Sequence, residues 1–484
     1  MSKKFENQGE HQLIMNRAKE ASLVLKPVHT LSGHESLINT CSFSKDGGLV
    51  VSSSADGTVR LWHTQSGEQL ANFKGHWGTM VQSCAFVPNP KAIAKHLEAM
   101  HSSDSECELG PRIADIESSG DSLESFSEFS EEEDDQPLII SASDEDVKVW
   151  GALDGKEKAS MLIDCDGLLQ GFALSPDGQK MLTNMDDQCI ILSTIDEDSR
   201  AVRLKGHEGA AKSFCFSEDG TQILTSSTDG SVKLWDSENG NEIITCQGHT
   251  ESVWKAVFSP DGSSILSCSA DKTLRVWDRS SGKEEAVMEG HKSAIHLCAY
   301  SPNGRWIASA DKEKEIIVWD SNVNGADHKS PISLKGHDSF IWNIQFSPDS
   351  MLLLSTSSDG AMLLWAMPHG QLVASLRGHE DGVKSCSFSP RGDALVSSSH
   401  DNSLMLWNIS GCYFEAYLQV MKSFFDSRTK NQFPGAICQI MAEYAWPDCV
   451  SELEIEMEYK PQVEEVKETS LKPAPRRRVK SCKF

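Results

Sequence analysis

The residues that could most directly carry chemistry are a histidine, a hydroxyl, an aspartate and a tryptophan that recur together along the chain. In one copy of this set they are His249, Ser267, Asp271 and Trp277. Serine, histidine and aspartate could in principle form a nucleophilic triad. A triad, however, would occur once and would need an oxyanion hole, whereas this set occurs in most of a series of similar units. We therefore predict that the chain is not an enzyme and that the set has a structural role.

The units that carry this set are clearest in residues 204–320, where three consecutive copies begin with Gly-His and end with Trp-Asp. These residues recur at intervals of 42 positions, at His207, His249 and His291 and at Trp235, Trp277 and Trp319. A fixed period of about this length is typical of propeller blades, each made of four strands. The units resemble those of the WD-repeat family. The resemblance implies an all-β propeller whose ring closure removes exposed sheet edges.

The resemblance also implies what the recurring polar set does. In WD-repeat proteins the histidine of Gly-His, a strand hydroxyl, a turn aspartate and the tryptophan indole form a buried hydrogen-bond chain that ties the strands of one blade together. Buried polar groups need partners, and a complete network makes the blade rigid. The residues expected in this role are His34, Asp56, Trp62, His207, Asp229, Trp235, His249, Asp271, Trp277, His291, Trp319, His337, Asp359, Trp365, His379, Asp401 and Trp407.

Counting the units predicts an eight-bladed propeller over residues 23–410, and a seven-bladed ring with one divergent unit is the alternative. Blade three is the divergent unit, because it lacks Gly-His and has Ser193 where tryptophan is expected. Residues 23–31 fill the place of an outermost strand although no blade precedes them. We therefore expect this segment to pair with the last blade and close the ring.

Blade two contains an acidic, serine-rich insert at residues 91–136. Trp62 and Trp150 are 88 residues apart, compared with the usual 42. Residues 102–136 hold thirteen acidic residues and one arginine. Such a composition cannot bury enough apolar surface to offset the entropy of ordering, so we expect disorder. A plain tether and a regulated interaction segment both remain open. The second is favoured by three serines with an acidic residue three positions on, which suits an acidophilic kinase: Ser118, Ser125 and Ser130.

Three segments flank the repeats. Residues 1–22 are polar and receive no assigned function. Residues 411–446 contain two stretches with apolar residues at helical spacing, 414–425 and 434–446, and predict a short helical extension. Residues 447–484 form an acidic and then basic tail, which we expect to be disordered.

Composition narrows the partners and the location of the protein. The formal net charge of −26 argues against a general nucleic-acid binder, because such proteins need a basic surface. No apolar run approaches the length of a membrane span and the N-terminus lacks a signal peptide, so we expect a soluble cytoplasmic protein without membrane contact. The basic run at residues 476–480 suggests the nucleus as a second location. The fourteen cysteines include no C-x-x-C pair, so we expect reduced thiols, no metal and no cofactor.

The positions that vary between units point to a binding surface. In the WD-repeat family the residue after the apolar start of the first strand lies at the mouth of the central channel, on the face of the Gly-His loops. By this resemblance the channel-mouth residues are Asn39, Gln82, Gln170, Lys212, Trp254, His296, Trp342 and Lys384, with Trp77 beside them. Trp254 and Trp342 are of the type enriched at binding hot spots. Ordinary partly exposed aromatic residues are the alternative interpretation.

These observations lead to one main functional prediction and two alternatives. The main prediction is a non-enzymatic scaffold that binds peptides or proteins on the Gly-His face and works within a multi-protein complex. A propeller fold by itself does not establish this function. The first alternative is a substrate receptor of a cullin-type ubiquitin ligase. The predicted C-terminal helices leave room for it, although the Trp-Asp-x-Arg docking motif is absent after Trp235, Trp277 and Trp319. The second alternative, an enzyme at the channel mouth, has only His296 and nearby lysines in its favour.

Overall fold

The structure is a computed structural model that describes residues 23–76, 78–88, 137–144, 146–162, 169–185, 190–194, 201–322 and 330–413. The chain divides into two compact units, residues 1–422 and 423–484, and all described residues lie in the first. Several predictions fall outside the described residues: the insert, the two C-terminal helices, the tail, Trp77, Ser118, Ser125 and Ser130.

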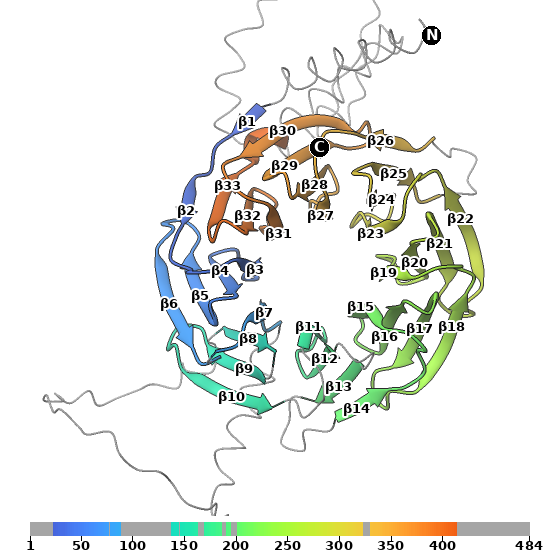
Figure 1. The fold of residues 1–484 in the computed structure, drawn as a ribbon, viewed down its shortest axis with the longest axis horizontal. Coiled ribbons are helices and arrows are strands. Elements are labelled where there is room, and N and C mark those ends of the chain that lie inside the picture. Colours follow the sequence, from blue (N-terminus) through green and yellow to red (C-terminus); the bar gives the residue numbers. More distant parts are fainter. Residues whose placement is uncertain are drawn as a thin grey trace, which may run out of the picture. The chain divides into compact units, whose positions relative to one another are not determined.

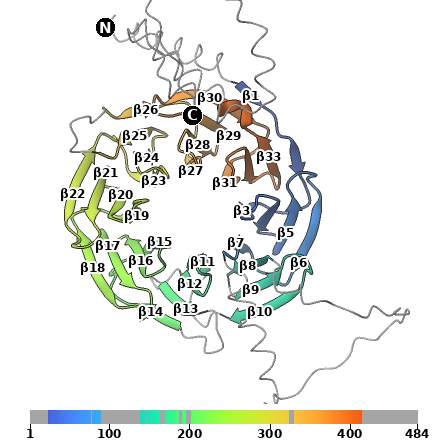
Figure 2. The same ribbon diagram turned by 180° about the vertical axis from the view of Figure 1, so that it is seen from behind.

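The described strands form eight sheets that follow one another around a ring in sequence order (Figure 1), and the view from behind shows the same circle (Figure 2). Within a blade, consecutive strands pair antiparallel from the innermost strand outward. Blade one contains β3 (Ile38–Phe43), β4 (Leu49–Ser54), β5 (Thr58–His63) and β6 (Gln69–Lys74). Blade two contains β7 (Val81–Phe86), β8 (Leu138–Ser143), β9 (Asp146–Gly151) and β10 (Glu157–Leu162). Blade three contains β11 (Leu169–Leu174), β12 (Lys180–Met185), β13 (Ile190–Thr194) and β14 (Ala201–Leu204).

The remaining blades repeat this plan. Blade four contains β15 (Ala211–Phe216), β16 (Gln222–Ser227), β17 (Ser231–Asp236) and β18 (Glu242–Gln247). Blade five contains β19 (Val253–Phe258), β20 (Ser264–Ser269), β21 (Thr273–Asp278) and β22 (Glu284–Glu289). Blade six contains β23 (Ile295–Tyr300), β24 (Trp306–Asp311), β25 (Ile316–Asp320) and β26 (Ile332–Leu334). Blade seven contains β27 (Ile341–Phe346), β28 (Leu352–Ser357), β29 (Ala361–Ala366) and β30 (Gln371–Arg377), and blade eight contains β31 (Val383–Phe388), β32 (Ala394–Ser399) and β33 (Leu404–Asn408). The prediction of eight blades is confirmed, and the seven-bladed alternative is wrong because the divergent blade three also forms a four-stranded sheet.

The N-terminal segment closes the ring differently from the prediction. Its second half, β2 (His29–Leu31), pairs antiparallel with β33 and completes blade eight, as expected. Its first half, β1 (Leu23–Leu25), instead pairs parallel with β30 and becomes a fifth strand of blade seven. Pro27 lies between the two strands, and proline lacks the backbone N–H that a continuous ladder needs. The prediction of a single strand across residues 23–31 is therefore wrong.

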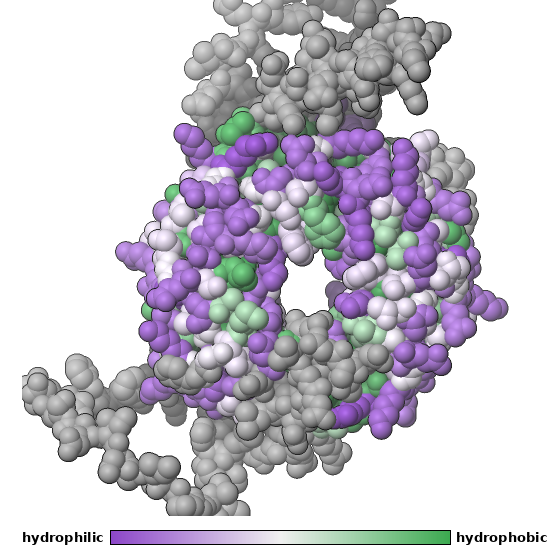
Figure 3. Space-filling model, viewed as in Figure 1, coloured by the Kyte–Doolittle hydropathy of each residue, from purple (hydrophilic) through white to green (hydrophobic). Residues whose placement is uncertain are grey.

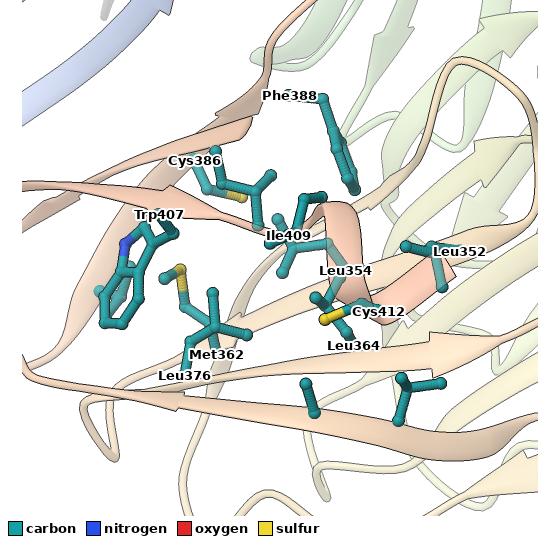
Figure 4. Close-up of a cluster of buried hydrophobic side chains, with 14 of the residues drawn as sticks. Leu352, Leu354, Met362, Leu364, Leu376, Cys386, Phe388, Trp407, Ile409 and Cys412 are labelled. Atoms are coloured by element: carbon teal, nitrogen blue, oxygen red, sulfur yellow. The ribbon is translucent and has the colours of Figure 1, made fainter. Parts of the chain in front are cut away.

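The core lies between adjacent blades, where the middle strands are covered on both faces. All six residues of β28 are buried, whereas Phe73 is the one buried residue of the outer strand β6. Figure 4 shows the cluster between blades seven and eight, to which Leu354, Leu364 and Trp407 all belong. The helical residues 410–413 follow β33, and Cys412 within them belongs to the same cluster and is fully buried. This packing fixes where the chain leaves the last blade.

The long segment between residues 88 and 137 connects β7 with β8, the first and second strands of blade two. Because these strands are antiparallel and the Gly-His loop enters the first of them, this connection starts at the opposite end of the blade. The strand ends are held together by a hydrogen bond from the Val87 N–H to the Leu138 carbonyl (2.9 Å). Blade two therefore forms its regular sheet despite the interruption.

Candidate functional site

Seven of the eight blades contain the recurring polar set as a hydrogen-bond network within the described residues. In blade five the indole N–H of Trp277 donates to the Ser267 hydroxyl oxygen (2.8 Å), which also lies 2.8 Å from Nε2 of His249. Nδ1 of His249 lies 2.8 Å from a carboxylate oxygen of Asp271. The corresponding residues of the other blades are His34, Ser52, Asp56 and Trp62; His76, Ser141, Asp146 and Trp150; His207, Thr225, Asp229 and Trp235; His291, Ser309, Asp311 and Trp319; His337, Ser355, Asp359 and Trp365; and His379, Ser397, Asp401 and Trp407.

Two of these networks contain residues that the sequence analysis missed. In blade two the insert separates the parts of the network, so His76 contacts Asp146 across 70 positions of sequence. In blade six Asp311 comes 20 residues after His291, whereas the usual separation is 22. A fixed spacing rule could not have found these aspartates. The only signal was the tryptophan at the end of each unit.

Burial sets the protonation state of these networks. Desolvation lowers the pKa of His34, His76, His207 and His249, so these imidazoles are neutral at pH 7. A neutral ring can donate from Nδ1 to the aspartate and accept the hydroxyl proton at Nε2, while the hydroxyl oxygen accepts from the indole. Burial alone would raise the pKa of Asp229, but hydrogen bonds outweigh it and hold that pKa at about 2. The central hydroxyls are buried and all groups are engaged, which suits a structural network.

The predicted channel-mouth residues share a backbone feature. Each is the second residue of the innermost strand of its blade, and at each the register with the next strand shifts. In blade five Val253 pairs with Ser269 and Lys255 pairs with Cys268, so Trp254 is left over as a β-bulge. Bulges re-aim side chains and are common beside functional sites. The eight residues therefore lie at the same level of the ring, at the end where the Gly-His loops enter. In the space-filling view the ring is hollowed at its centre and its surface is mainly hydrophilic (Figure 3).

The lysine–tryptophan cluster consists of Lys212, Trp254 and Lys312, from blades four to six. The Nζ atoms of Lys212 and Lys312 lie 5.7 Å and 5.0 Å from the Trp254 ring centroid, which is cation–π geometry. Among the described residues, neither lysine forms an ion pair with a carboxylate. Trp254 is partly buried and its indole N–H has no hydrogen-bond partner in the described part of the chain. The Trp254 ring therefore binds two ammonium groups and does not present an open apolar surface.

The aromatic cluster consists of His296, Phe340, Trp342 and His400, from blades six to eight. The His296 ring stacks on Phe340 with centroids 4.4 Å apart, and Phe340 meets Trp342 edge to face at 5.0 Å. The His400 ring also meets Trp342 edge to face, with the ring centroids 6.2 Å apart. Trp342 is 39 % exposed, so the cluster presents apolar surface to solvent.

Hydrogen bonds hold the aromatic cluster in place. The indole N–H of Trp342 donates to the Ser358 hydroxyl (2.6 Å), and Nε2 of His296 donates to the Ile341 carbonyl (2.7 Å). Desolvation lowers the pKa of His296, which leaves this imidazole neutral at pH 7. A neutral, hydrogen-bonded ring against Phe340 is suited to packing and not to proton transfer.

The other predicted mouth residues differ in accessibility. Asn39 is only 4 % exposed: its amide donates to the Val81 carbonyl (2.9 Å) and accepts from Lys384 Nζ (2.7 Å). The Asn39 side chain therefore offers little surface to a partner, because both of its ends join blade one to its neighbours. Gln82 donates to Asp144 (2.9 Å) and Lys384 is partly buried, with its pKa lowered by desolvation. The backbone of Gln170 lies in β11, but its side chain is outside the described part of the chain. Trp77 is outside it entirely.

Four residues near the mouth were not predicted from the sequence: Met80, Lys312, Phe340 and His400. Met80 and Phe340 directly precede an innermost strand, and Met80 is 45 % exposed. Lys312 and His400 lie in turns between the second and third strands of their blades. Because strands alternate in direction, those turns and the Gly-His loops meet at one end of the ring. The alternating strand direction could therefore have predicted that Lys312 and His400 lie near the mouth.

Other kinds of site have little support in the described ranges. They contain no group of three or more His, Cys, Asp or Glu side chains that could hold a metal ion. Each cysteine in them is a free thiol, and seven of these eight thiols are buried. No helix within those ranges is long and apolar enough to cross a membrane.

Comparison with known proteins agrees with this architecture. The family model described as WD domain, G-beta repeat matches residues 25–63, 199–236, 240–278, 282–320, 329–366 and 370–408. The unmatched stretch holds blade two with its insert and the divergent blade three.

Similar curated proteins match only over short stretches. The chain is 41% identical to a Notchless protein homolog of Arabidopsis thaliana over 59 residues, 12% of each chain. It is 30% identical to cross-pathway control WD-repeat protein 2 of Flammulina velutipes over 124 residues, 24% of this chain and 38% of the relative. It is 34% identical to eukaryotic translation initiation factor 3 subunit I of Aspergillus niger over 70 residues, 14% and 20% of the two chains. The matches thus span well under half of each relative.

Proposed function

Because this chain belongs to the WD-repeat family, whose propellers typically mediate protein interactions, we propose that it is a non-enzymatic scaffold that binds a peptide or protein partner at the channel mouth on its Gly-His face. The observation that carries the proposal is the aromatic cluster, in which Trp342 is 39 % exposed yet held by a hydrogen bond to Ser358. Aromatic residues that are both rigid and accessible are typical of binding hot spots.

The surroundings of the cluster support a recognition role over a packing role. His296, Phe340 and Trp342 come from two blades, and His400 comes from a third. A blade can fold without these residues, since the same positions elsewhere hold Lys212 or Gln82. The exposed apolar surface is thus an addition to the repeat and not a requirement of it.

The proposal is tested by affinity purification with mass spectrometry of wild type and of a Phe340→Ala/Trp342→Ala double variant. The matched control is Leu70→Ala/Ile243→Ala, which removes two apolar side chains of the outer strands that are 50 % and 45 % exposed. We expect the mouth variant to fold and to lose at least one partner that the control retains. A folded mouth variant that keeps every partner contradicts the proposal.

The relatives suggest the setting in which such a scaffold works. One relative is a subunit of translation initiation factor 3, and another is named ribosome assembly protein 4, from Saccharomyces cerevisiae. We propose that this chain likewise acts within a multi-protein complex, in the cytoplasm with the nucleus as a second location. Residues 91–136 and 411–484 would contact further partners, with Ser118, Ser125 and Ser130 as phosphorylation sites. No observation on the described residues favours the ubiquitin-ligase alternative.

A further inference from the structure

The side chains around the mouth narrow the chemistry of its ligand. Building on the proposed function, we propose that the mouth binds an acidic linear peptide in which an aspartate or glutamate stands within a few residues of an aromatic or large aliphatic side chain. The carboxylate would pair with Lys212 and Lys312 over Trp254. The apolar side chain would pack on Phe340 and Trp342.

The first support is a set of cations without an ionic partner. Some lysines of the propeller are ion-paired, as Lys233 Nζ is with Glu242 (2.8 Å). In contrast, Lys212 and Lys312 rest on the Trp254 ring with no carboxylate partner among the described residues. In a protein of net charge −26, two uncompensated cations on one indole ring are an unusual local concentration of positive charge.

The second support is that the turn aspartates of blades four to six are already engaged. Asp311 is 1 % exposed and lies 3.0 Å from Nδ1 of His291. Asp229 and Asp271 are bound to His207 and His249 in the same way. These carboxylates cannot turn to neutralise the lysines without breaking the networks of their blades. The positive charge is therefore available to a ligand.

The third support is that the two clusters are neighbours. Lys312 Nζ lies 5.0 Å from the Trp254 ring, and its charge adds to the desolvation that lowers the pKa of His296. His296 in turn stacks on Phe340. One short ligand can therefore reach the cations and the apolar surface together. The tryptophan also holds the two ammonium groups before binding, so less side-chain entropy is lost when a ligand arrives.

A nucleic acid is the other polyanion that such cations could attract. It is disfavoured because backbone binding needs many phosphate contacts, whereas this cluster offers two free lysines in a strongly acidic protein. The rings of the aromatic cluster also stack on one another, which leaves Trp342 as its one exposed side chain. Successive stacked bases would need several open ring faces.

The test selects ligands from a display library of random twelve-residue peptides on the immobilised full-length protein. We expect enriched peptides to carry acidic residues next to Phe, Trp, Tyr, Leu or Ile. Their affinity should fall about tenfold or more in a Lys212→Glu/Lys312→Glu variant, because like charges then face the ligand. The matched control is Lys45→Glu/Lys283→Glu, which reverses two exposed lysines in turns at the opposite end of the blades and should change affinity less than about twofold.

Three results would overturn the inference: no enrichment, enrichment of neutral or basic peptides, or equal loss of affinity in both charge-reversal variants. A fluorescein-labelled single-stranded oligonucleotide is titrated in parallel. If it binds the wild type and is released by Lys212→Glu/Lys312→Glu, the cluster serves nucleic acid instead. If only this inference fails, the Phe340→Ala/Trp342→Ala variant still loses a partner that the wild type binds. If the proposed function fails as well, that variant binds the same partners as the wild type.

Discussion

Single buried hydroxyls hold the polar networks of the blades together. Ser267 is fully buried and accepts from Trp277 while it contacts His249, so its oxygen serves two partners at once. A buried donor or acceptor without a partner costs about 1–3 kcal/mol. The same serine or threonine recurs in seven blades, which gives each blade its own internal brace.

Replacing this hydroxyl predicts a measurable loss of stability. Ser267→Ala should lower the free energy of unfolding by about 2–4 kcal/mol, because it leaves the indole N–H of Trp277 and Nε2 of His249 buried without partners. Denaturant unfolding measures this difference. The control is Ser280→Ala, whose hydroxyl is exposed and contacts only Asp278. Equal stability of the two variants would show that the network does not brace the blade.

The networks also predict how stability depends on pH. The pKa of His34, His76, His207 and His249 is lowered in the folded state, so the unfolded chain binds more protons below its histidine pKa of about 6.5. Stability should therefore fall as the pH drops below about 6.5. It should fall further toward pH 2 as Asp229 and Asp359, each with a pKa of about 2, become protonated. Thermal melts from pH 8 to pH 4 measure the first step, and an unchanged Tm between pH 7 and pH 5 would contradict it.

At the scale of elements, two features could not be predicted from the repeat pattern. The division of residues 23–31 into β1 and β2 depends on which edge strand lies nearest, and only the folded ring brings β30 beside Leu23. The aromatic cluster likewise joins side chains from blades six, seven and eight. The strands themselves were predictable, because their period and turns are local. Contacts between blades are not local and leave no spacing to detect.

The two N-terminal strands predict different consequences of truncation. Removal of residues 1–25 deletes β1 and should change stability little, since β30 keeps its antiparallel partner β29. Removal of residues 1–31 also deletes β2 and exposes β33, whose pairing with β2 closes the ring. We expect a large drop in Tm and faster proteolysis only for the longer truncation, with removal of residues 1–22 as the control. Equal Tm values for both truncations would show that β2 does not close the ring.

At the scale of the whole propeller, the proposed binding site lies on one face, and the insert and the C-terminal extension begin on the opposite face. The mouth residues lie at the Gly-His end of the blades, whereas the connection between β7 and β8 and the turn that Tyr413 contacts lie at the other end. Tyr413 donates a hydrogen bond to the Gly392 carbonyl (2.9 Å), in the turn between β31 and β32. The insert and the C-terminal extension therefore both begin on the face away from the proposed binding site.

This separation predicts that the insert can be removed without loss of the fold. Replacing residues 91–136 with a six-residue Gly-Ser linker should preserve blade two, because Phe86 and Ile139 are paired in the ladder. Stability should rise by about 1–2 kcal/mol, since a shorter loop loses less entropy on closure. Thermal denaturation measures this. A large loss of stability would mean that the insert packs on the propeller.

The central claim, that the Gly-His face holds a partner through the aromatic cluster, is tested most directly by site-specific photo-crosslinking. A benzoylphenylalanine placed at Trp342 is compared with one at Arg391, an exposed residue in the turn between β31 and β32 on the opposite face. We predict that position 342 crosslinks to a discrete partner, that Phe340→Ala abolishes the product, and that position 391 does not give it. The same product from position 391, or none from position 342, would contradict the account.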